Sequence, residues 1–112
     1  MASVTQDSLD NAIKGIKNLY RTEFRGKPRG RFILTRWQLM TSLGTRRLHA
    51  STIARLQDEA LAAGLVIIDL DDLFPVVEVK IVRKYRRPPN ELFSTIFPSP
   101  EDSYDLLDED GD

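Results

Sequence analysis

The chain has 112 residues, of which 41% are hydrophobic and 29% charged, and its formal net charge is −1. These values are typical of one small folded domain and leave too little chain for two. Because cysteine is absent, a disulfide, a thiolate zinc site and a cysteine nucleophile are excluded. With no signal peptide and no apolar run near the ~20 residues that span a bilayer, we expect a soluble cytoplasmic protein without a membrane partner.

The charge is unevenly distributed along the chain. Residues 97–112 hold seven acidic residues and no basic one, so residues 1–96 hold 16 basic and 10 acidic residues, a net of +6. This asymmetry indicates two parts, a basic body that binds an anion and a separate acidic tail. The alternative is that the tail only increases solubility. We expect a flexible N-terminus over residues 1–7, one domain over 8–96 and a disordered acidic tail over 97–112.

Residues 8–24 have the spacing of an amphipathic helix. Asp7 or Ser8 is the expected N-cap, because a short oxygen-bearing side chain accepts a hydrogen bond from the first turn. The apolar residues expected to enter the core are Leu9, Ala12, Ile13, Ile16, Tyr20 and Phe24. The basic residues on one flank, which we interpret as solvated surface, are Lys14, Lys17 and Arg21.

A basic segment without regular structure is expected next. Residues 25–31, RGKPRGR, place two glycines and a proline among four basic residues, so neither a helix nor a strand is predicted there. RNA binding through this segment ranks last among the functions considered, since the segment is short and contains no aromatic residue for base stacking until Phe32 follows it. The apolar run RFILT then predicts a short edge strand.

A second helix is predicted over residues 36–43, RWQLMTSL. Thr35 and Gln38 match a capping box, and Gly44 supplies a left-handed C-cap position. Trp37 is expected to anchor the core rather than to stack on bases, because no other aromatic residue lies nearby in the sequence. The other residues expected to be buried in this helix are Met40 and either Leu43 or Leu39.

A third helix and two strands complete the predicted domain. The helix runs from about Ser51 to Ala63, with Ser51 or Thr52 as its cap, and Gly64 ends it. Its inward-facing residues are Ile53, Leu56, Ala60 and Ala63. The strands are VIIDL and PVVEVKIVRKY, joined by the turn DDLFP; the residues alternating onto one face of the second strand are Val77, Val79 and Ile81. NELFSTIF adds a short helix or a packing arm.

The order of these elements resembles the winged helix-turn-helix superfamily. The resemblance depends on a helix pair with a glycine-containing turn, followed by a hairpin, in RWQLMTSLG, STIARLQDEALAAGLVIIDL and VVEVKIVRKY. It covers about residues 8–85 and matches no particular family within the superfamily. It implies an α+β fold of three helices with a short strand and a two-stranded β-hairpin wing. It also implies double-stranded DNA as partner, read in the major groove by the third helix.

The resemblance also implies a set of DNA-binding residues. A helix N-terminus attracts phosphate oxygens, because its N–H groups are unpaired and its dipole is positive there. The expected exposed residues of the third helix are Ser51, Thr52 and Arg55, of which Arg55 would pair with guanine O6 and N7. The residues that would meet phosphates before this helix are Arg46, Arg47 and His49. The residues expected to meet the DNA backbone from the end of the second wing strand are Lys80, Arg83 and Lys84.

The wing tip departs from this pattern because it is acidic. Asp69, Asp71 and Asp72 would repel a phosphate backbone, so either the basic strand end meets the DNA or the wing has another purpose. Leu73 and Phe74 at this turn would contact a second protein or a dimer mate, or else fold back onto the domain's own core.

No catalytic set is present in the sequence, so we expect no enzyme, no metal and no cofactor. His49 is the only histidine and has no recognisable nucleophile partner. The first hypothesis is therefore a small DNA-binding transcriptional regulator, with a homodimer as the expected arrangement. The alternative is a protein–protein interaction module, as a docking subunit or a nucleic-acid-mimicking inhibitor, that uses the acidic wing tip and tail. The tail would bind a protein partner or cover the chain's own basic surface.

Overall fold

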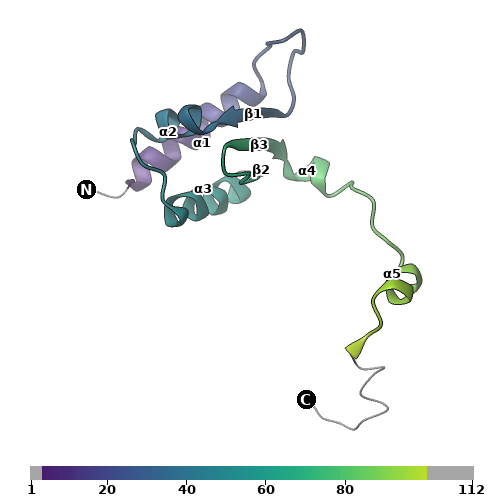
Figure 1. Cartoon of the computed structure of the whole chain (residues 1–112). Helices are drawn as coiled ribbons and strands as arrows, with labels where there is room; N and C mark the ends of the chain where they lie inside the picture. The colour runs from purple at the N-terminus through teal and green to yellow at the C-terminus, as the bar shows by residue number, and fades with distance from the viewer. Residues whose placement is uncertain (1–3, 101–112) are drawn as a thin grey trace.

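The computed structural model describes residues 4–100, which form an α+β protein (Figure 1). Residues 101–112, which hold the acidic residues of the predicted tail, lie outside the described residues, as do residues 1–3 of the predicted flexible N-terminus. In chain order the elements are α1 (Gln6–Tyr20), β1 (Phe32–Thr35), α2 (Arg36–Leu43), α3 (Ala50–Ala62), β2 (Leu65–Ile67), β3 (Leu73–Glu78), α4 (Val79–Val82) and α5 (Asn90–Ile96).

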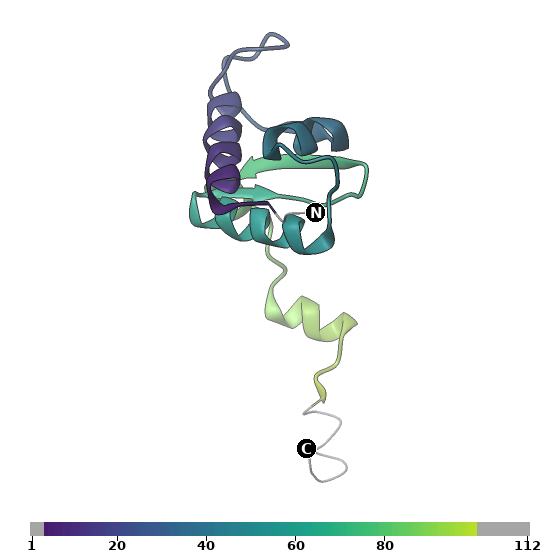
Figure 2. The same ribbon diagram turned by 90° about the vertical axis from the view of Figure 1, so that its left-hand side faces the viewer.

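The three strands form one antiparallel sheet in the order β1–β3–β2. Leu34 pairs with Phe74 across the first ladder, and Ile67 pairs with Val76 across the second. Helices α1, α2 and α3 lie together on one face of this sheet (Figure 2). The core lies between the two layers, and Leu39, Leu56 and Phe74 are completely buried there.

Helix α1 forms close to its predicted position. Five of the six predicted core residues are buried, from Leu9 to Tyr20, and Phe24 is the exception. Phe24 is 41% exposed because the helix ends at Tyr20, so helical spacing no longer applies to it. The predicted cap at Asp7 or Ser8 is wrong, since the Thr5 side chain accepts the capping hydrogen bond from the Ser8 backbone N–H.

Helix α2 confirms the predicted capping and corrects two predicted core residues, Trp37 and Met40, of which Met40 is half-buried. The Thr35 hydroxyl accepts from the Gln38 N–H at 3.1 Å, and the Gln38 side chain accepts from the Thr35 N–H at 2.9 Å. Gly44 is left-handed, with φ of 68°. Trp37, in contrast, is 68% exposed. The helix buries Leu39 and Leu43, and a residue two positions before Leu39 is turned by about 200°, toward solvent.

Helix α3 starts one residue earlier than predicted and lacks the predicted cap. Its N-cap is His49, whose side chain makes no capping hydrogen bond, so Ser51 and Thr52 both lie inside the first turn. Thr52 is buried with Ile53 and Leu56, which corrects the expectation that Thr52 faces solvent. Ile53, Leu56 and Ala60 are buried as predicted, whereas Ala63 is the C-cap and only half-buried.

The second predicted wing strand is too long. Strand β3 ends at Glu78, and Val79–Val82 form the helical turn α4 instead of continuing the alternation. Strand β2 begins opposite Glu78 and β1 begins opposite Val76, so the chain beyond Glu78 has no strand to pair with. After the Val79 N–H, which donates to the Gly64 carbonyl at 2.9 Å, the backbone bonds locally, as in the 2.9 Å hydrogen bond from the Arg83 N–H to the Val79 carbonyl.

Helix α5 stands away from the rest of the molecule (Figures 1 and 2). The radius of gyration is 19.6 Å, against about 13 Å for a compact domain of this length. The predicted short helix in NELFSTIF is thus present, but it does not pack as an arm against the body. Within residues 4–100, no helix is both long and apolar enough to cross a membrane.

Candidate functional site

The predicted DNA-binding residues fall into two groups, near opposite ends of α3. Arg46, Arg47, His49 and Ser51 surround its first turn, and we call them the α3 N-terminal surface. Lys80 and Arg83 lie with Ala63 and Gly64, just beyond the last turn of α3. A helix of 13 residues is about 20 Å long, so the structure does not bring the two groups onto one small surface.

The α3 N-terminal surface combines two arginines with an uncapped helix start. Arg46 and Arg47 are exposed in the loop after α2, and His49 and Ser51 are exposed beside them. The loop is shaped by Thr45, whose hydroxyl accepts from the Arg47 N–H at 3.3 Å and donates to the Arg47 carbonyl at 3.0 Å. No side chain caps the first N–H groups of α3. This surface therefore offers both guanidinium groups and backbone donors to an anion.

Arg55 has a different setting from the one expected of a base-reading side chain. It is half-buried, and its Nη1 donates a 2.7 Å hydrogen bond to the carbonyl of Val4, in the segment before α1. The side chain thus links α3 to the start of the chain instead of projecting freely from the helix. The solvent face of α3 carries Ala54, Asp58 and Leu61 and no cation.

The acidic wing tip is joined to the loop before α3 by Arg36. Its Nη1 donates to the Asp71 carbonyl at 2.7 Å and lies 3.8 Å from the Asp71 carboxylate, and its Nη2 donates to the Leu48 carbonyl at 3.3 Å. Asp69 tightens the turn by accepting a 2.8 Å hydrogen bond from the Asp71 N–H. Asp69, Asp71 and Asp72 are all exposed, so the predicted negative charge lies close to the α3 N-terminal surface.

Two apolar residues follow the wing tip, and the structure assigns one of them to the core. Phe74 is completely buried, so the alternative that it folds back onto its own domain is confirmed and a partner contact is wrong for it. The reason is the register, which pairs Phe74 with buried Leu34 and points both side chains toward the helices. Leu73 is half-buried.

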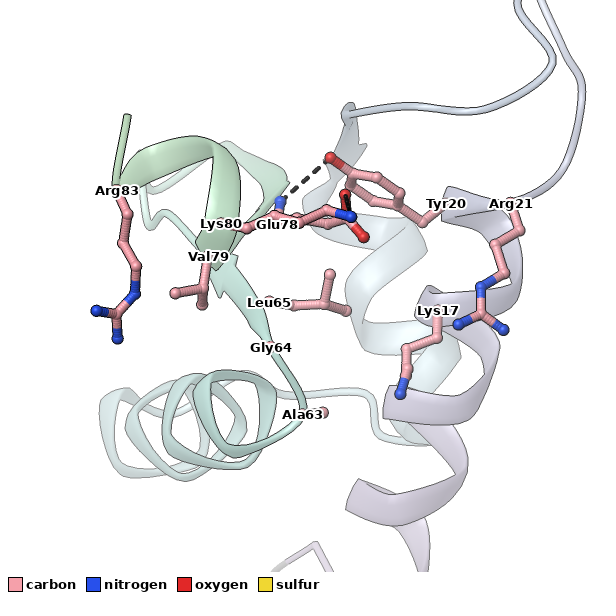
Figure 3. Close-up of a pocket in the computed structure, with 10 residues that line it drawn as sticks. All are labelled: Lys17, Tyr20, Arg21, Ala63, Gly64, Leu65, Glu78, Val79, Lys80 and Arg83. Atoms are coloured by element: carbon pink, nitrogen blue, oxygen red, sulfur yellow. Dashed lines mark hydrogen bonds and ion pairs between the residues drawn. The ribbon is translucent and has the colours of Figure 1, made fainter. Parts of the chain in front are cut away.

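A basic pocket occupies the other end of α3 (Figure 3). Lys17 and Arg21 from the end of α1 lie across from Lys80 and Arg83, around a volume of about 370 Å³. Lys84 is exposed just beyond α4 but does not line the pocket. The aliphatic side chains among the lining residues are Ala63, Leu65 and Val79. Lys17 and Arg21 were interpreted from the sequence as solvated surface, so half of these cations were missed.

Tyr20 and Glu78 form the wall between the two sides of the basic pocket. The Tyr20 hydroxyl accepts a 3.1 Å hydrogen bond from the Glu78 N–H, which joins α1 to the end of β3. The Glu78 carboxylate pairs with Arg29 at 3.7 Å and with Lys80 at 3.9 Å. Among residues 4–100, no ion pair involves Lys17, Arg21 or Arg83.

The described residues contain no cluster of three or more side chains suited to hold a metal ion. No known protein family, curated protein or solved structure matches the chain. The functional argument therefore depends on the chain's own geometry and charge.

Proposed function

We propose that this chain is a winged helix-turn-helix protein that binds double-stranded DNA, as a small transcriptional regulator. The order α1–β1–α2–α3–β2–β3 and the sheet order β1–β3–β2 support this interpretation, with α2 and α3 as the helix pair and the β2–β3 hairpin as the wing. In such an arrangement the third helix presents its N-terminal turn to the major groove.

One observation carries the proposal: Arg46 and Arg47 are exposed beside the uncapped start of α3. Two guanidinium groups and free backbone donors on one surface suit the closely spaced phosphates of a duplex. Ser51 is the exposed polar residue of the first turn, and its hydroxyl can bond to a base edge or a phosphate.

Arg55 has a supporting role in this proposal. Its hydrogen bond to the Val4 carbonyl holds the start of the chain beside α3, so we assign it to positioning rather than to guanine reading. Because the solvent face of α3 has no cation, affinity for DNA comes mainly from contacts with the phosphate backbone of the duplex. Discrimination between base sequences is then small.

The direct test is fluorescence anisotropy of the full chain with a labelled random-sequence duplex. We expect saturable binding at about 50 mM salt, and a logarithm of affinity that falls linearly with the logarithm of salt concentration. Equal affinity for several unrelated duplexes would agree with backbone-dominated binding. Absence of binding at about 50 mM salt would contradict the proposal.

A protein-docking role is the second candidate, and the exposed face of α3 favours it. Leu61 is 58% exposed there, one turn after the acidic Asp58. Deleting residues 98–112 distinguishes the candidates. Tighter DNA binding after the deletion supports a tail that covers the basic surface, while no binding in either form supports docking to a protein.

A further inference from the structure

Helix α5 displays an apolar face that no other element covers in the described structure. The residues of this face are 49–62% exposed and are Leu92, Phe93, Ile96 and Phe97. The rings of Phe93 and Phe97 lie 4.9 Å apart between centroids, which makes the face continuous. Glu91, Ser94 and Thr95 occupy the other side of the helix.

The body carries an apolar groove that is also uncovered. It lies between α1 and α2, has a volume of about 370 Å³, and includes buried Ile16 and Leu34 among its lining residues. Leu19 and Trp37 line it as well and are 39% and 68% exposed. The groove is open at Gly15, where an added Cβ would meet no atom within 4 Å.

We propose that α5 of one copy docks into the α1–α2 groove of a second copy, and that the contact is reciprocal, giving a homodimer. An exposed apolar cluster on a small domain marks an interaction surface. An amphipathic helix with anchors one turn apart, such as Phe93 and Phe97, is the form of ligand that an apolar groove accepts. The groove volume lies within the about 300–1,000 Å³ range of small binding sites.

The connection between α4 and α5 favours a second copy over the same chain. In Figures 1 and 2, α5 lies apart from the three-helix and sheet body, along the chain that leaves α4. Residues 83–89 form this connection and span at most about 25 Å when fully extended. In this structure the connection holds α5 away from its own α1–α2 groove, so the apolar face of α5 is presented to a second molecule.

Charge complementarity supports the same pairing. The chain that follows α5 holds seven acidic residues after Phe97. The α1 side of the groove leads into the loop of residues 21–31, which carries Arg25, Lys27, Arg29 and Arg31. An α5 docked in the groove of another copy brings acidic chain close to this basic loop. The inference does not depend on DNA binding, because neither surface belongs to the α3 N-terminal surface.

Trp37 provides a specific readout, because it is the only tryptophan and it lines the groove. We expect the full chain to form a dimer in sedimentation equilibrium over about 1–100 µM, and its tryptophan emission to shift to shorter wavelength as the dimer forms. A chain that stays monomeric at about 100 µM contradicts the proposal, and an emission already blue-shifted in that monomer would indicate docking within one chain.

A matched pair of variants on α5 tests the contact. Phe93→Asp places a charge on the apolar face, and Ser94→Asp adds the same charge on the opposite side. Because α5 lies apart from the body, neither change disturbs the core. We expect Phe93→Asp to raise the dimer dissociation constant at least about tenfold and Ser94→Asp to leave it nearly unchanged. Equal effects of the two variants would overturn the proposal.

Mixing two defective chains tests reciprocity. Trp37→Asp damages the groove but keeps α5, and Phe93→Asp damages α5 but keeps the groove. Each chain alone should be monomeric, and the mixture should form a heterodimer with one intact contact. The tryptophan signal then comes only from the Phe93→Asp chain, whose groove is occupied, and should shift to shorter wavelength. A mixture that remains monomeric, with unshifted emission, contradicts the helix-in-groove arrangement.

Discussion

The N-terminal end of α3 has its cations on a loop, while the C-terminal end is surrounded by cations on helices. Arg46 and Arg47 stand on the loop, next to helix N–H groups and close to the acidic wing tip. Lys17 and Arg21 stand instead at the C-terminal end of α1. Carbonyl groups at a helix C-terminus attract cations, so part of that positive charge is already used to stabilise α1.

Counting cations therefore misjudges which end attracts an anion more strongly. The basic pocket has four cations, but Lys80 pairs with Glu78, and two others interact with the α1 dipole. At the N-terminal end of α3 the dipole adds to the arginines instead of opposing them. The comparison teaches that the attraction of a basic residue for an anion depends on the end of the helix beside which it lies. The sequence does not show this placement directly.

The largest effect is expected from the residue that anchors the wing beside the α3 N-terminal surface. Phe74→Ala should reduce the free energy of unfolding by about 3–5 kcal/mol, because it empties a completely buried site. Leu61→Ala is the control and should change it by less than about 0.5 kcal/mol, since Leu61 is largely exposed. Urea denaturation measures both values. Equal losses would mean that the core is arranged differently.

The next prediction compares the two ends directly. The double variant Arg46→Ala/Arg47→Ala should weaken DNA binding more than tenfold. It should also reduce the slope of log affinity against log salt concentration by about 2. Lys17→Ala with Arg21→Ala removes the same charge from the basic pocket and should reduce the slope by less than about 1. Anisotropy titrations over a salt series give both slopes. The reverse order would identify the basic pocket as the DNA contact.

At the basic pocket, Tyr20→Phe should reduce the free energy of unfolding by about 1 kcal/mol. The change removes the acceptor of the Glu78 N–H, which is partly buried and then lacks its partner. Chemical denaturation gives the stability, and amide exchange at Glu78 reports on the site itself. No change in exchange at Glu78 would show that Tyr20 does not hold this end of β3.

The smallest effect is expected at the acidic wing tip. Asp72→Lys should tighten DNA binding by a few fold, about 0.5–1 kcal/mol, because it replaces a repelled charge with an attracted one near the α3 N-terminal surface. Asp10→Lys makes the same charge change on α1 and controls for net charge. If both variants tighten binding equally, the wing tip does not lie near the DNA.

Features determined by neighbouring residues could be predicted from the sequence. The apolar face of α1 and the Thr35–Gln38 capping box follow from spacings of three and four residues, and both are present. The end of β3 at Glu78 could not be predicted, because it depends on where β1 and β2 begin opposite it. Trp37 was wrongly predicted to be buried, because the prediction relied on its large aromatic side chain and not on its angular position around the short helix α2.

The candidate site shows the same division. Arg46 and Arg47 were identified because they precede the third helix, which is a feature of chain order. Lys17 was missed because its neighbour Lys80 is distant in sequence, and the Tyr20–Glu78 hydrogen bond that brings α1 to the end of β3 joins residues 58 positions apart. Arg55 was identified from the resemblance, but its bond to Val4 is a tertiary contact that the sequence does not indicate.

Arg36 makes the wing tip and the loop before α3 mechanically dependent on each other. Its guanidinium holds the carbonyls of Asp71 and Leu48 at once, so moving one carbonyl strains the bond to the other. A molecule that shifts the wing tip would therefore alter the affinity of the neighbouring arginines for a second molecule, and by thermodynamic reciprocity the second would alter the affinity of the first by the same factor. A single side chain thus links the wing tip to the loop that carries Arg46 and Arg47.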